Sequence, residues 1–179
     1  MNIRAMRLFV GIPVAGGALA ALGGALERWR QAFPELRWED VRDLHVTLQF
    51  IGAFPAGREH TLTTALEAIA LPRCTLQVAG LGGFPSLRRP RALWAGVAAH
   101  PELIKLAEAV ALQLGGLGIV REERAYTPHI TLARARSTGP MPSDAPEIWG
   151  DCPVAGFQLY ETLPAPLSRP RYRVLHRFA

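Results

Sequence analysis

The chain has 179 residues, of which 49% are hydrophobic, so it is long enough to bury the core of one domain or of two small lobes. Its 20 Lys and Arg outnumber its 15 Asp and Glu, which gives a net charge of +5, and Lys105 is the only lysine. Arginine suits phosphate, but a GC-rich gene also favours arginine, so charge alone does not establish a polyanionic partner. The cysteines, Cys74 and Cys152, are too few for a disulfide framework and suit a reducing compartment.

The N-terminal region allows two interpretations. Residues 8–26 carry no charge and follow Arg4 and Arg7, as in a signal peptide or a short membrane span. Pro13 and five glycines interrupt this stretch, however, and divide it into an expected strand at 6–13 and an expected helix at 16–33. No other segment is long and apolar enough to cross a membrane.

Periodicity and turn residues predict the remaining elements. Further strands are expected near 36–39, 44–52, 74–81, 91–98, 128–135, 154–161 and 171–178, and further helices near 58–70 and 101–115. The glycine-rich 80–84 is interpreted as a turn, and 137–153, rich in Pro, Ser and Gly, as a long surface loop. The alternating strands and unequal connections favour an α+β fold over a doubly wound parallel sheet.

Two short motifs carry the chemistry. His45 and Thr47 stand in His-Val-Thr-Leu, and His129 and Thr131 stand in His-Ile-Thr-Leu. Since strand side chains alternate, each histidine shares a face with its threonine, whereas Val46, Leu48 and Phe50 are expected on the opposite face. Each motif follows a strand and a helix, which predicts two similar lobes that contribute one motif each to a shared groove.

The paired histidines suit acid–base catalysis on a phosphodiester. A single such histidine would more simply be a core residue, but two facing imidazoles supply a base and an acid at once, and threonine hydroxyls donate to phosphate. A metal site has little support, because the chain has no His-Glu-x-x-His and neither motif contains a carboxylate or a thiol. A Gly-x-Ser-x-Gly nucleophile elbow and a P-loop lysine are also absent from the sequence.

The two motifs, together with 6-MRLFVGIP-13, 80-GLGGFP-85, 126-YTPHITLAR-134 and 157-FQLYET-162, resemble the two-histidine phosphoesterases, and in particular the RNA 2′,3′-cyclic phosphodiesterases, once called 2′-5′ RNA ligases. The resemblance implies a single bilobal domain over residues 1–179, with antiparallel sheets, flanking helices and a central groove. It implies opening of a 2′,3′-cyclic phosphate to a 2′-phosphate without metal or cofactor. It also places Met6 at the usual start of the family, which argues against a signal peptide.

The same resemblance suggests roles for particular residues. His45 would donate a proton to the 3′ leaving oxygen, His129 would activate water, and Thr47 and Thr131 would hold the phosphate. Arg134 would contact phosphate, although strict alternation places it opposite His129 unless a bulge intervenes. Tyr126 would either stack on a base or pack at a strand entrance.

Two departures from the family pattern concern the grip on substrate. Gln49 stands where a basic residue is common, and the 161–173 segment differs from the usual ending. His60, His100 and His176 are expected to be surface or packing residues.

Two alternative functions stay open. The first is action on a small cyclic phosphate such as ADP-ribose cyclic phosphate or on a short 2′-5′ oligonucleotide. The second is an RNA-end-binding module without turnover. The expected partner is an RNA or nucleotide with a cyclic phosphate end, tRNA halves included, with reverse ligation as a second activity. We expect a cytoplasmic monomer with no membrane contact.

Overall fold

The computed structural model describes residues 5–87, 89–121, 123, 125–135, 141–164 and 170–179. Its elements follow one another in the order β1 (Ala5–Pro13), α1 (Gly16–Ala32), β2 (Arg37–Trp38), η1 (Val41–Asp43), β3 (His45–Pro55), α2 (Glu59–Glu67), β4 (Cys74–Phe84), β5 (Ala92–Val97), α3 (Pro101–Gly115), β6 (His129–Arg134), β7 (Ile148–Val154), β8 (Phe157–Thr162) and β9 (Tyr172–Phe178). The three helices and most of the strands lie where periodicity predicts them.

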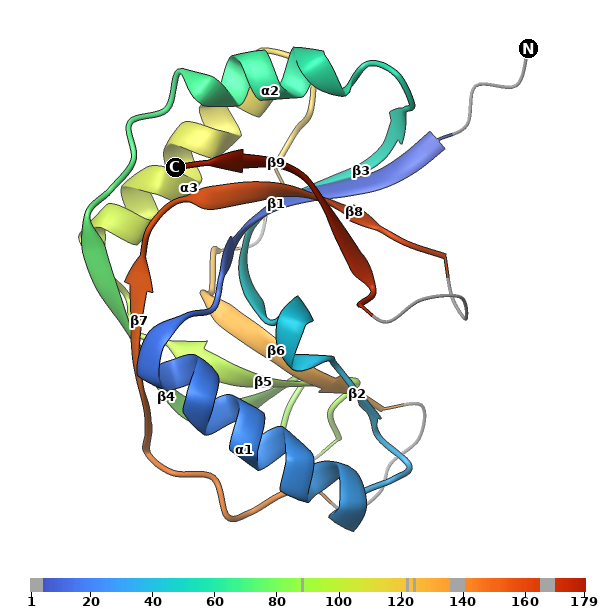
Figure 1. Ribbon diagram of the computed structural model, residues 1–179, viewed down its shortest axis with the longest axis vertical. Coiled ribbons are helices and arrows are strands. Elements are labelled where there is room, and N and C mark those ends of the chain that lie inside the picture. The colour runs from blue at the N-terminus through green and yellow to red at the C-terminus, as the bar shows by residue number, and fades with distance from the viewer. Residues whose placement is uncertain (1–4, 88, 122, 124, 136–140, 165–169) are drawn as a thin grey trace.

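All nine strands of the described chain join one antiparallel sheet in the order β7-β4-β5-β6-β3-β1-β8-β9, with β2 attached to β6. The predicted α+β class with antiparallel pairing is confirmed. The sheet curls, as Figure 1 shows, so β1, β3, β8 and β9 lie toward one end and β4, β5, β6 and β7 toward the other. These two halves meet where Val46 of β3 pairs with Ile130 of β6.

The helices α1 and α3 each pack on the half of the sheet opposite to the strand that they follow. α1 follows β1 but packs on β7, whereas α3 follows β5 but packs on β3 and on α2 (Figure 1). The apolar residues of α1 recur at helical spacing and bury Leu22, Leu26 and Trp29 completely or nearly so. Pro101 begins α3, and the Nδ1 atom of His100 accepts a hydrogen bond from the backbone N–H of Glu102 there. No helix among the described residues is long and apolar enough to cross a membrane.

A β-bulge interrupts each motif strand at the same place. Opposite β1, Gly11 pairs with Thr47 and Val10 pairs with Gln49, so Leu48 is the extra residue of β3. Opposite β5, Trp94 pairs with Thr131 and Leu93 with Ala133, so Leu132 is the extra residue of β6. The bulges reverse the alternation that follows each motif.

The expectation that Phe50 shares a face with Val46 is therefore wrong. Phe50 pairs with Phe9, on the same face of the sheet as His45, and is 58% exposed. Gln49 instead points to the buried side, where it is 4% exposed and its amide donates to the carbonyl of Ile119 at 3.5 Å. Gln49 thus lies on the side of the sheet away from the histidines, and the expected effect of Gln49 on substrate binding is not supported.

Two loop predictions also fail. The glycines of 80–84 lie inside β4, where Gly80 adopts φ 71° at an irregularity and Gly82 accommodates the ring of Trp94 on its neighbour β5. The last six residues of 137–153 belong to β7, which buries Trp149 and Cys152 against β4. Since β7 is an edge strand, its Pro153 does not interrupt the ladder, and the single strand expected at 154–161 is in fact the end of β7 followed by β8. Residues 137–140 lie outside the described part of the chain.

Candidate active site

The two histidines are anchored in the same way. Nδ1 of His45 lies 2.6 Å from the carbonyl oxygen of Asp43, and Nδ1 of His129 lies 2.7 Å from that of Thr127. A carbonyl oxygen only accepts, so each Nδ1 carries the proton and donates it. In the neutral ring this leaves the lone pair on Nε2, and each imidazole can accept or deliver a proton through that atom.

Aromatic rings surround His45. The ring centroids of Phe9, Tyr172 and Tyr160 lie 4.7, 5.1 and 5.7 Å from that of His45. These rings replace water around the imidazole, and burial lowers the pKa of His45 from 6.5 to about 4. His45 is therefore neutral near pH 7 when the site holds no substrate.

His129 has a similar setting on the other half of the sheet. The ring of Phe84 meets it edge-on at 5.0 Å, and the ring of Trp94 lies 5.8 Å away. Burial again lowers the histidine pKa, and the charge of Arg134 lowers it further. Phe84 is 39% exposed, so this aromatic contact lies partly at the surface.

The two motifs face each other across the junction of the halves. Val46 pairs with Ile130 in antiparallel strands. The residue that precedes Val46 therefore lies opposite the residue that follows Ile130, and the reverse, so His45 lies toward Thr131 and His129 toward Thr47. The positive charge of His129 depresses the pKa of His45, as expected for neighbouring rings. The four predicted side chains thus come together on one face of the sheet, which we call the histidine face.

The bulge at Leu132 turns Arg134 onto the histidine face. Arg134 pairs with Ala92, in the same row of β5 residues as Trp94 and Gly96, the partners of Thr131 and His129. Its Nε lies 3.5 Å from Oε1 of Glu39, and its charge lowers the pKa of both histidines. Arg134 is therefore near both imidazoles.

Tyr126 packs beside the first motif. Its hydroxyl donates a 3.0 Å hydrogen bond to the backbone carbonyl of Thr47, and the guanidinium of Arg121 lies 5.2 Å from its ring centroid. Burial raises the pKa of its phenol. These contacts account for Tyr126 as a packing residue at the strand entrance and leave stacking on a base without a structural observation.

Several residues of the site carry no local motif. Asp43 is 5% exposed, and its carboxylate accepts hydrogen bonds from the backbone N–H groups of Arg171 (2.7 Å) and Tyr172 (3.3 Å). Glu39 is 7% exposed and lies near two arginines. In the sequence, the only sign that Asp43 and Glu39 belong to the site is that both are acidic and precede the first motif closely. The arginines and the tyrosine that they contact lie far along the chain.

The three other histidines lie outside this site. His60 is exposed on α2, His100 caps α3, and Nε2 of His176 lies 3.6 Å from Oε1 of Glu67. Among the residues that the structure describes, no group of three or more His, Cys, Asp or Glu is placed to hold a metal ion.

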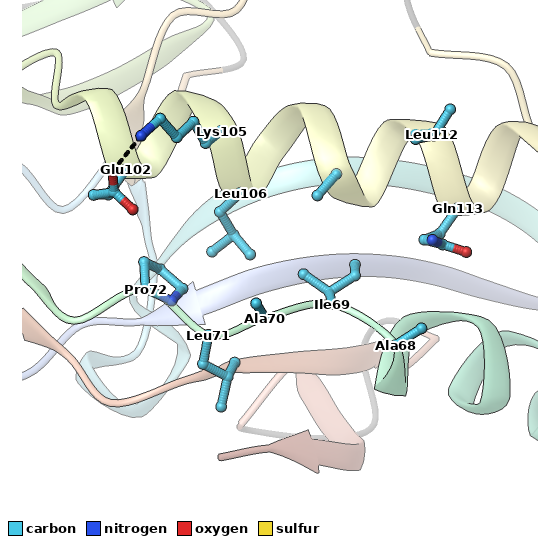
Figure 2. A pocket seen from close by; sticks show the side chains of 11 residues that line it. Ala68, Ile69, Ala70, Leu71, Pro72, Glu102, Lys105, Leu106, Leu112 and Gln113 are labelled. Atoms are coloured by element: carbon cyan, nitrogen blue, oxygen red, sulfur yellow. Dashed lines mark hydrogen bonds and ion pairs between the residues drawn. The ribbon is translucent and has the colours of Figure 1, made fainter.

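A separate cavity of about 340 Å³ lies between α3 and the segment that follows α2. Figure 2 shows Leu71, Ile69 and Leu106 on its walls and the ion pair of Glu102 with Lys105, 2.7 Å long, at one end. Neither motif strand lines this cavity, so the acid–base chemistry of the histidines does not take place in it.

Comparison with known proteins finds relatives of one family. A family model described as the 2′-5′ RNA ligase superfamily matches residues 19–162. An RNA 2′,3′-cyclic phosphodiesterase of Thermus thermophilus is 32% identical over 189 aligned positions, which cover 97% of this chain and 90% of that protein. A longer relative with the same name from Geobacillus stearothermophilus is 32% identical over 128 residues, which cover 70% of this chain and 41% of that protein.

Among solved structures, that of E. coli LigT complexed with 3′-AMP aligns with a TM-score of 0.77 and 30% identity over 97% of each chain. The family model covers both motifs and most of the sheet. The protein belongs to the 2′-5′ RNA ligase superfamily.

Proposed function

We propose that the protein hydrolyses the 2′,3′-cyclic phosphate at the end of an RNA and leaves a 2′-phosphomonoester. The observation that carries this proposal is the pair of imidazoles on the histidine face, each anchored through Nδ1 and each with Nε2 available. The names of the relatives point to the same reaction.

The reaction needs one proton acceptor and one proton donor. Nε2 of His129 accepts a proton from water as the water oxygen bonds to phosphorus, and the bond between phosphorus and O3′ breaks. Protonated His45 gives its proton to O3′, so the products are a 2′-phosphate and a free 3′-hydroxyl. When the 5′-hydroxyl of a second RNA replaces water, His129 accepts the proton of that hydroxyl as its oxygen bonds to phosphorus, and His45 again protonates O3′, so the product is a 2′-5′ phosphodiester. Cleavage of such a 2′-5′ bond is the reverse reaction, in which the two histidines exchange roles.

Binding of the substrate prepares His45 for its role as the acid. The phosphodiester is an anion, and a negative charge next to an imidazole favours the charged ring. The phosphate thus raises the pKa of His45 from its low value in the free site. Thr47 and Thr131 donate hydroxyl hydrogen bonds to the phosphate oxygens, and Arg134 adds a charged contact to them.

The test is the position of the phosphate in the product. The protein is incubated with EDTA and an oligoribonucleotide ending in a 2′,3′-cyclic phosphate, and the product is identified by phosphorus NMR. We expect a 2′-phosphomonoester. A 3′-phosphomonoester would mean that O2′, and not O3′, is the leaving group. Tight binding without product would support an end-binding module, and faster turnover of ADP-ribose 1″,2″-cyclic phosphate would support the small-molecule alternative.

We propose further that the enzyme works as a monomer in the cytoplasm, with tRNA halves among its substrates. Both motifs come from the same chain, so one copy supplies the complete acid–base pair. Cys74 and Cys152 are both free thiols, which suits a reducing compartment.

A further inference from the structure

The backbone of Arg171, which immediately precedes β9, makes two hydrogen bonds. Its N–H donates to Oδ2 of Asp43 at 2.7 Å, and its carbonyl accepts from the N–H of Leu163 at 2.9 Å. Asp43 is also the residue whose carbonyl anchors His45. The direction in which the Arg171 side chain leaves the backbone is therefore tied to the loop that orients the first histidine.

The side chain of Arg171 shares a carboxylate with Arg134. Nη1 of Arg171 lies 3.6 Å from Oε1 of Glu39, and Nε of Arg134 lies 3.5 Å from the same oxygen. The Glu39 side chain is only 8% exposed, whereas those of Arg171 and Arg134 are 30% and 45% exposed. Two cations thus lie near one buried carboxylate, and this group of three side chains carries a net positive charge.

Glu39 is itself held in place next to the second motif. Its backbone N–H donates at 2.9 Å to the carbonyl of Leu132, the bulge residue of β6. Its carboxylate occupies one edge of each guanidinium and leaves other N–H groups of both arginines available to a ligand. Because the arginines are already oriented, binding an anion there costs less side-chain entropy than it would with free arginines.

Arg171 lies one aromatic ring away from the proton-transfer pair. Its guanidinium carbon is 5.7 Å from the ring centroid of Tyr172, and that ring meets the His45 ring edge-on at 5.1 Å. Arg134, in contrast, is near enough to lower the pKa of both histidines. The two arginines thus extend the positive charge from the reacting phosphate outward along the histidine face.

We infer that Arg171 forms a subsite for a second phosphate of the substrate, the phosphodiester that precedes the terminal nucleotide of the RNA. This inference rests on the proposed function and narrows its substrate class. A cyclic mononucleotide has no second phosphate, so Arg171 is a specificity residue that favours an RNA end over a single nucleotide. Glu39 is the residue that positions it.

The experiment compares two substrates that differ by one nucleotide, and hence by one phosphodiester. Adenosine 2′,3′-cyclic phosphate and the dinucleotide ApA ending in a 2′,3′-cyclic phosphate are given to the wild type and to Arg171→Gln. We expect the substitution to lower kcat/KM for the dinucleotide about 10- to 100-fold, mainly through KM, as for a lost hydrogen bond to a charged group. The mononucleotide should change less than about twofold, since it makes no such contact.

Salt dependence and a charge-matched control sharpen the comparison. Each phosphate contact with a single strand contributes a slope of about −0.7 to log binding against log salt, and Arg171→Gln should remove one such contact for the dinucleotide. Arg28→Gln removes the same charge from the exposed side of α1 and should alter neither substrate. Equal effects of Arg171→Gln on both substrates, or none on either, would overturn the subsite.

Binding separates this inference from the proposed function. Calorimetry with 3′-AMP and with ApA carrying a 3′-phosphate needs no turnover, and Arg171→Gln should weaken only the second ligand. If the wild type hydrolyses neither substrate but this difference in binding remains, the proposed reaction fails and the subsite stands. If Arg171→Gln impairs ADP-ribose 1″,2″-cyclic phosphate more than the dinucleotide, the second anion is a pyrophosphate and the assignment to RNA is wrong.

Discussion

Leu48 and Leu132 occupy equivalent positions in the two halves of the sheet, each as the extra residue of a bulge directly after a His-x-Thr motif. Each bulge brings the residue five positions after the histidine back to the histidine face. In β6 that residue is Arg134, and in β3 it is Phe50. The two halves thus present a cation on one side and an exposed aromatic ring on the other.

The two halves of the sheet resemble each other in more than the order of their elements. In both halves a strand, a helix and a motif strand follow one another, and the first strand pairs antiparallel with the motif strand. Both histidines donate Nδ1–H to the carbonyl two residues earlier. The halves differ in what surrounds each imidazole, and we expect that difference to separate the roles of acid and base.

Replacement of either histidine should abolish most of the activity. His45→Ala and His129→Ala remove one proton-transfer group each, and each should lower kcat/KM for a cyclic phosphate end at least about 10²-fold. His60→Ala, on the exposed side of α2, is the control and should change it less than about twofold. Full activity in either motif variant, measured with EDTA present, would contradict the mechanism.

The low pKa of His45 should make the protein less stable in mild acid. The ring takes up a proton at pH 6.5 when unfolded but only near 4 when folded, so stability is lost as the pH falls from 6.5 toward 4. Urea unfolding of the wild type and of His45→Asn across this range measures the effect. The wild type should lose roughly 2–3 kcal/mol of unfolding free energy that His45→Asn does not lose. Glu39 and Asp43 titrate in both proteins, so their contributions cancel; parallel curves would refute the shift.

Arg134 should set the pH range of activity as well as the affinity for phosphate. Its charge lowers the pKa of both histidines, so Arg134→Gln should raise both and move the bell-shaped profile of kcat/KM to higher pH. The lost phosphate contact should also lower the maximum about 10- to 100-fold. Arg28→Gln should leave the profile in place, and an unshifted profile in Arg134→Gln would show that its charge does not reach the imidazoles.

Gly11 should be intolerant of a side chain because His45 lies against it. A Cβ atom there would lie 3.0 Å from the carbonyl oxygen of Val46 and 3.3 Å from Cδ2 of His45. Displacement of a catalytic group by about 1 Å can cost 10²-fold, so Gly11→Ala should lower kcat at least about tenfold while the protein still folds. Gly24→Ala, inside α1 with space around it, should leave kcat unchanged and raise the melting temperature slightly.

Local patterns in the sequence were sufficient for most of the elements and for the core of the site. Apolar spacing of 3.6 located α1 and α3, and alternation placed each histidine beside its threonine, because both periodicities depend only on neighbouring residues. The edge strand β7 was missed for the same reason. Its Gly150 and Pro153 are typical of loops, and only pairing with β4 makes a strand of that segment.

What local periodicity could not decide is everything that depends on register between distant strands. The bulges at Leu48 and Leu132 exist because β1 and β5 pair with the motif strands in a particular register, and they determine which way Gln49 and Arg134 point. Oε1 of Glu39 and Nη1 of Arg171 lie 3.6 Å apart, but the two residues are far separated in the chain, so no short sequence window contains both. The sequence by itself determined that two imidazoles, each beside a threonine, would lie on strand faces. Only the tertiary structure decided which charges surround them, because burial and pairing between remote segments bring those charges together.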